Sequence, residues 1–198
     1  MERLDLTTMT RPFSKMAFLL VFFLLIGKVS GFAQVQTRIV AGQISLGNAI
    51  KPDENSYSGF RDSLEKKLKV NPHDTTSLFY KALLLEQFNN QLAKPSPGDK
   101  IVYQNLIAAK NIITQLFDLK MQDFRLKVLR AQTYMDLTYQ FANDESWKYN
   151  AKEIDDRRNL FNNYKKLSNE YHDELAKIDS INAYDYQKLK VNSNYPVR

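Results

Sequence analysis

The chain has 198 residues, a length that fits one domain or one domain preceded by a targeting segment. It contains no cysteine, which excludes disulfides, thiolate metal sites and a cysteine nucleophile, and six glycines and six prolines are too few for a collagenous or low-complexity chain. The net charge is +6, of which residues 1–33 carry +2, so the remainder predicts a mildly basic, mixed-charge surface.

Residues 1–33 have the composition of a cleavable secretory signal peptide. Basic residues precede the apolar run at 16–27, and after it the small residues Gly31 and Ala33 stand just before the polar Gln34. A positive segment, a short apolar segment and small residues before the cleavage point are the three parts of such a signal. We therefore expect cleavage after Ala33 and export to the periplasm or the outside of a bacterium.

Two other interpretations of the apolar run stay open. An uncleaved membrane anchor needs about 20 apolar residues to span a bilayer, whereas this run reaches only about a dozen before Lys28. A buried core helix fits poorly, because the run is uniformly apolar and lies at the terminus. Translation can also start at Met9 or Met16, since the basic segment is longer than a signal needs.

Residues 34–56 give the least regular pattern, and we expect a linker or a poorly formed first helix there. Gly42 and Gly47 interrupt both the helical and the strand spacing of the apolar residues around them. Pro52 then closes the segment. No binding role is predicted for this part of the chain.

From Tyr57 onward, the spacing of apolar residues predicts consecutive helices. The first ends at Asn71-Pro72, because proline disfavours helical geometry in the residue before it, and Asp74 or Thr75 can cap the second. After a Pro- and Gly-containing loop at 91–99, a third helix is expected at 101–119 and a fourth from Asp123 to Phe141.

The C-terminal part of the chain predicts a long helix at 146–178. Its apolar residues recur at spacings of three, four and seven, which indicates one helix of many turns or two helices with a kink near Asp155–Arg158. Ser180 can cap a short final helix, and residues 192–198 are expected to fray.

Residues 57–72 resemble the second helix of a tetratricopeptide (TPR) repeat, a helix–turn–helix unit of 34 residues. The matching positions are Tyr57, Leu64, the Glu65-Lys66 pair, Leu68, Val70 and the closing Asn71-Pro72, whereas Phe60 stands where a small residue is expected. Further units are aligned at Thr75 and Phe124, although these starts lie farther apart than one repeat. The resemblance implies an all-α fold of antiparallel helical hairpins in a TPR-like right-handed superhelix over 57–191, with a long C-terminal helix. A plain helical bundle is the alternative.

The resemblance also implies a concave groove that binds an extended peptide or a partner helix. Carried over by register, its positions are Thr76, Phe79, Leu83, Glu86, Gln87, Arg125, Val128, Gln132, Met135 and Asp136. The family's carboxylate clamp needs Lys and Asn at positions that hold apolar residues or glutamine here, so we do not expect that clamp. Alternatively, the apolar members pack beneath the helix at 146–178 in a closed bundle without a groove.

No catalytic, cofactor or metal site is predicted. The only histidines are His73 and His172, and we expect both to be exposed, since His172 lacks a partner four residues away for a metal pair. Acidic residues stand beside lysines and arginines, as on a solvated helix face, and no nucleophile or nucleotide-binding motif is found. Acidic residues also dilute the basic patch formed by Arg157, Arg158, Lys165 and Lys166, which argues against nucleic acid.

We therefore expect an exported, non-catalytic protein–protein interaction module of the cell envelope, a TPR-like scaffold. Its partner would be a protein or peptide, and it would meet the membrane only through the signal segment before cleavage. Homo-oligomerisation is also expected, because the end of a short repeat stack exposes an apolar face. The alternatives are a structural closed helical bundle and an enzyme whose site has no sequence signature.

Overall fold

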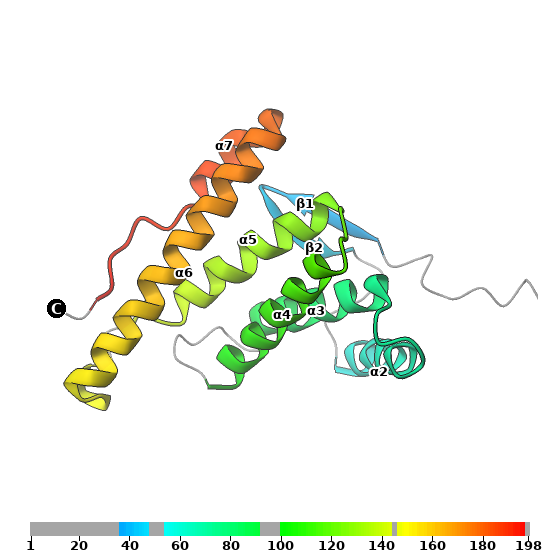
Figure 1. Ribbon diagram of the computed structural model, residues 1–198, viewed down its shortest axis with the longest axis horizontal. Helices are drawn as coiled ribbons and strands as arrows, with labels where there is room; N and C mark the ends of the chain where they lie inside the picture. The colour runs from blue at the N-terminus through cyan, green and yellow to red at the C-terminus, as the bar shows by residue number, and fades with distance from the viewer. Residues whose placement is uncertain (1–35, 48–53, 92–99, 144–145, 197–198) are drawn as a thin grey trace, which may run out of the picture. The chain divides into compact units, whose positions relative to one another are not determined.

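The computed structural model describes residues 36–47, 54–91, 100–143 and 146–196, so the signal segment lies outside the described residues. This part of the chain is mostly helical, with one two-stranded sheet (Figure 1). The elements are β1 (Thr37–Val40), β2 (Gln43–Leu46), α2 (Glu54–Val70), α3 (Thr75–Gln91), α4 (Lys100–Asp118), α5 (Phe124–Tyr139), α6 (Ala151–Ile178) and α7 (Ala183–Lys188), with single 3-10 turns at Ser146–Lys148 and Ser180–Asn182. Among these helices, none combines the length and the apolar character needed to cross a membrane.

The helix ends follow the local signals that the sequence carries. α2 stops at Val70, before Asn71-Pro72, as predicted. The Asp74 carboxylate accepts a hydrogen bond from the Ser77 amide at 3.2 Å, and Asp123 accepts one from the Arg125 amide at 2.9 Å. α6 is one helix of 28 residues, and the side chains of Asn150 and Glu153 form a capping box at its start.

Each helix from α2 to α6 packs against the next one in the chain, and α3 also meets α5. Small residues allow close approach within this stack, since Ala82 and Ala109 are fully buried and Ala131 is nearly so. Larger apolar side chains such as Leu106 and Leu129 fill the spaces between the helices. The predominance of helix is thus confirmed, whereas the TPR-like superhelical twist stays a prediction.

Within the segment 34–56, the prediction of a linker or a poorly formed helix is wrong for residues 37–46, which form an antiparallel β-hairpin. Its two-residue turn has positive φ at both Ala41 (49°) and Gly42 (77°), which matches the twist of a tight hairpin. The Gly47 amide donates to the Gln36 carbonyl at 2.6 Å, and a Cβ at Gly47 would lie 2.8 Å from that oxygen. The two glycines that interrupt the apolar pattern therefore build the hairpin.

The C-terminal residues expected to fray are held against α6. The Asn169 side chain both donates to the Val191 carbonyl (3.1 Å) and accepts from the Val191 amide (2.8 Å). The Lys165 ammonium donates to the Ser193 carbonyl at 2.6 Å, and the Tyr195 ring lies 5.7 Å from the Phe161 ring. The described part of this tail, up to residue 196, is extended but anchored.

His172 also differs from expectation, because it is 1% exposed whereas His73 is exposed as predicted. It lies on the buried face of α6, with Nδ1 2.8 Å from the Ser168 carbonyl oxygen. Burial disfavours the charged imidazolium and lowers the pKa of His172 below its ordinary value, although the Ser168 carbonyl and the nearby Asp173 oppose this shift.

This burial predicts that the free energy of unfolding decreases between about pH 7.5 and about pH 5.5. The unfolded chain takes up a proton on His172 near its ordinary pKa of about 6.5, while the folded chain does so only at lower pH. Urea unfolding followed by circular dichroism measures the effect. His172→Gln should flatten this pH dependence and His73→Gln should leave it, and an unchanged slope in His172→Gln would contradict the assignment.

Candidate functional site

The outer edge of β2 lies against α3 and α5, on the faces expected to form the groove. The Ile44 amide donates to Gln132 Oε1 at 2.8 Å, and the Leu46 amide donates to Gln87 Oε1 at 2.7 Å. In an antiparallel pair, only every second residue of a strand bonds to the partner strand. The Gly47 amide bonds to Gln36, so the amides of Leu46 and Ile44, one and three residues earlier, point away from β1. Two glutamine side chains therefore take the place of a neighbouring strand.

The two glutamines are buried and linked to a buried carboxylate. Gln87 and Gln132 are each 8% exposed, and Glu86 is fully buried. Gln132 Nε2 donates to Glu86 Oε1 at 2.8 Å, which fixes its amide so that Oε1 faces the Ile44 N–H. A buried backbone N–H without an acceptor costs about 1–3 kcal/mol, so these bonds allow the strand edge to be buried.

Arg125 binds the other strand of the hairpin, β1, at Thr37, which pairs with Leu46. Its Nη1 donates to Thr37 Oγ1 at 3.3 Å, and its guanidinium lies 5.4 Å from the centre of the Phe79 ring. The Arg125 Nε–H donates to both carboxylate oxygens of Asp123, each at 3.0 Å, and hydrogen bonding to this guanidinium lowers the pKa of the Asp123 carboxyl. Arg125 thus connects the start of α5 to β1.

The hairpin turn packs against the C-terminal end of the chain. A Cβ at Gly42 would lie 2.9 Å from Leu189 Cδ1 and 3.1 Å from Tyr186 Cδ1. Tyr186 is fully buried, and its hydroxyl donates to Asp179 at 3.0 Å. This contact between the turn and α7 is not predicted from the sequence, where Gly42 marks only the turn itself.

A cavity of about 740 Å³ lies beside the hairpin and continues along the same two helices. Arg38 and Val40 of β1, with Gln43 and Ser45 of β2, line one wall. The other wall comes from the C-terminal halves of α3 and α5, with Glu86, Gln87, Gln132, Asp136 and Tyr139. The volume falls within the range of ligand-binding pockets, and the walls offer two carboxylates and one arginine.

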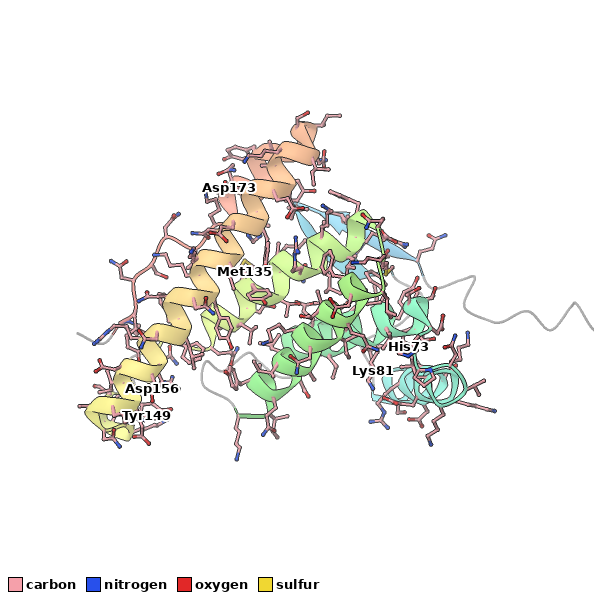
Figure 2. The ribbon with its side chains drawn as sticks, in the orientation of Figure 1. His73, Lys81, Met135, Tyr149, Asp156 and Asp173 are labelled. Atoms are coloured by element: carbon pink, nitrogen blue, oxygen red, sulfur yellow. The ribbon has the colours of Figure 1, made fainter. Side chains whose placement is uncertain are left out.

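The structure brings together part of the predicted groove. Glu86, Gln87, Gln132 and Asp136 meet at the cavity, whereas Phe79, Leu83 and Val128 are buried in the core and Thr76 is exposed on the first turn of α3. Arg125 and Met135 are half-buried, and Figure 2 labels Met135 on α5. The chain's own strand β2 therefore occupies the place where sequence analysis expected either an external peptide or the long C-terminal helix.

Comparisons with protein-family models, with curated proteins and with solved structures give no match to this chain. The TPR resemblance therefore stays a prediction that depends on the residues between Tyr57 and Phe141. In the part of the chain that the structure describes, no three histidine or carboxylate side chains are gathered as metal ligands.

Replacing Gln132 with alanine should destabilise the fold by about 2–4 kcal/mol, because the substitution removes the acceptor for the Ile44 amide and the donor to Glu86. Equilibrium urea unfolding measures this loss. Gln104→Ala is the matched control, since Gln104 is exposed on α4 and its loss should change the free energy of unfolding by less than about 0.5 kcal/mol. Equal stability of the two variants would show that the glutamine contact contributes little.

Proposed function

We propose that this chain is an exported, non-catalytic protein-interaction module of the bacterial cell envelope, with a TPR-like scaffold that binds an extended segment of a partner protein along α3 and α5. The observation that supports the proposal is the pair of hydrogen bonds from the Ile44 and Leu46 amides to Gln132 and Gln87. These contacts bind the backbone of an extended strand, which is how sheet-edge recognition gives affinity independent of side chains.

The partner segment would occupy the 740 Å³ cavity beside the hairpin. Asp136 and the buried Glu86 line this cavity from the helices, and Arg38 is the one basic residue among the described residues of its walls. The half-buried Asp136 carboxylate favours a segment with a lysine or arginine side chain, and the polar Gln43 and Ser45 can bond its backbone. Homo-oligomerisation remains a separate part of this proposal.

A structural helical bundle without a partner is the second candidate. The observation that favours it is the burial of Phe79, Leu83 and Val128, which removes most of the apolar surface that a groove would offer. The two candidates differ in what the cavity does, because only the interaction module requires Asp136 to contact another chain.

Export predicts that the full chain, expressed in a bacterium, is shortened so that its N-terminus is Gln34. Mass spectrometry of the intact protein and N-terminal sequencing measure this. Ala33→Arg should preserve the precursor, because signal peptidase requires a small residue before the cleaved bond, whereas Ala33→Ser should be processed normally. Recovery of the unprocessed chain from the parent sequence would contradict cleavage.

Peptide recognition predicts that a displayed library of unstructured decapeptides yields basic sequences that bind the chain. Fluorescence anisotropy should give affinities at least about tenfold weaker for Asp136→Arg, because the substitution reverses the charge of a cavity carboxylate. Asp156→Arg is the control, since Asp156 is exposed on α6, away from the lining of this cavity, and pairs with Lys152 of the same helix (Figure 2). Equal binding by both variants, or no binding above scrambled peptides, would favour the structural bundle.

A further inference from the structure

A second cavity, of about 340 Å³, lies where the start of α4, the end of α5 and the first turns of α6 meet, and it shares no lining residue with the cavity beside the hairpin. Lys100 and Tyr103 reach it from α4, Gln140 and Phe141 from just after α5, and Arg157 from α6. Figure 2 labels Tyr149, which also lines it, next to the N-terminal end of α6. Among the residues that the structure describes, two basic side chains and no acidic one line this cavity.

Arg157 is held in the wall of this cavity by two aromatic rings. Its guanidinium carbon lies 4.3 Å from the Tyr149 ring centre and 4.9 Å from the Phe141 ring centre. The stacking fixes the plane of the guanidinium but supplies no hydrogen-bond acceptor, and its Nε is buried without one among the described residues.

The carboxylates next to Arg157 in sequence bind other residues. Asp155 accepts a hydrogen bond from Arg158 at 2.7 Å, and Asp156 pairs with Lys152 at 3.3 Å. A stacked arginine whose Nε lacks an acceptor favours a planar anion, because a guanidinium and a carboxylate form paired hydrogen bonds. Lys100, exposed at the first turn of α4, adds a second positive charge at the rim.

Gln140 adds a second unsatisfied group to the same cavity. Its side chain is nearly buried, with 4% exposed, and its Oε1 has no hydrogen-bond donor among the described residues. A buried amide oxygen requires an N–H or O–H to offset its lost hydration. A ligand that fits both groups therefore carries a carboxylate for Arg157 and a donor, such as an amide N–H, for Gln140.

The remaining walls are apolar and require an apolar portion in the ligand. Tyr103 and Phe141 meet edge to face, with ring centres 5.8 Å apart, and Leu160 closes the cavity from α6. A doubly charged phosphate suits these walls less well, since its stronger hydration would be lost against aromatic carbon. A volume of about 340 Å³ lies at the small end of ligand-binding pockets.

We propose that this cavity binds an N-acylated amino acid with an apolar side chain. Its carboxylate is bound by Arg157 with support from Lys100, its amide N–H donates to Gln140 Oε1, and its side chain packs against Tyr103 and Leu160. Such a group occurs both as a free small molecule and at the carboxyl end of a peptide. The positions differ from those of the TPR carboxylate clamp, and the proposal does not depend on peptide binding along α3 and α5.

Isothermal titration of the purified chain with N-acetyl-L-phenylalanine tests this proposal. We expect saturable binding, with at least about tenfold weaker binding of N-acetyl-L-phenylalanine amide, which lacks the carboxylate, and of 3-phenylpropanoate, which lacks the N–H. A hexapeptide ending in phenylalanine separates the two sources, because a peptide end binds as tightly as the small molecule only if the cavity admits a chain. Inorganic phosphate should not compete.

Arg157→Gln should abolish binding, and Arg158→Gln, one residue along and paired with Asp155, should preserve it. Gln140→Leu should remove the preference for the acetylated amino acid over 3-phenylpropanoate. Circular dichroism checks that each variant is folded. If Arg157→Gln unfolds, Leu160→Trp replaces it, because a residue 37% exposed at the rim can carry an indole into the cavity and block it. Binding that survives these substitutions, absence of saturation at about 10 mM, or equal competition by phosphate would overturn the proposal.

Discussion

The amide of Gln132 is the interaction on which the arrangement of this chain depends. It accepts a hydrogen bond from the Ile44 backbone and donates one to Glu86, so a single side chain of α5 joins β2 to α3. A two-stranded hairpin is marginal by itself, because the outer edges of both strands lack partners. Here the side chains of two helices bind the β2 edge, and the strand pair becomes part of the helical core.

α5 contacts α3, α4, α6 and β2, which explains why its hydrophobic residues lie on several sides of the helix. Gln132 contacts α3 and the hairpin, whereas Arg130 and Tyr134 contact α6. The Arg130 guanidinium lies between the rings of Phe117 and Tyr171, at 4.3 and 3.9 Å, and pairs with Glu174 at 2.7 Å. Figure 1 shows α5 between the hairpin and α6.

The sequence predicts the helices well because their ends depend on local chemistry. Pro72 stops α2 and Asp123 starts α5 through contacts within a few residues. The hairpin could not be predicted in this way, since its turn is Ala-Gly and its edge partners lie 41 and 88 residues away. The helical register of the TPR resemblance is enough to predict that Glu86 and Asp136 lie near one another, and both line the cavity beside the hairpin. The burial of His172 and the contacts of Arg157 with two rings could not be predicted, because they depend on how distant elements pack.

The position of the hairpin turn against Leu189 and Tyr186 bears on the order in which the fold is completed. The hairpin is among the first parts of the described chain to be synthesised, and α7 is among the last. Because this contact requires both Gly42 and residues 186–189, it cannot form before α7 has been synthesised, and it closes a long loop. The stack of neighbouring helices and the contacts of β2 with α3 and α5 require no residue of α7, so the turn contact completes a structure that can form without it.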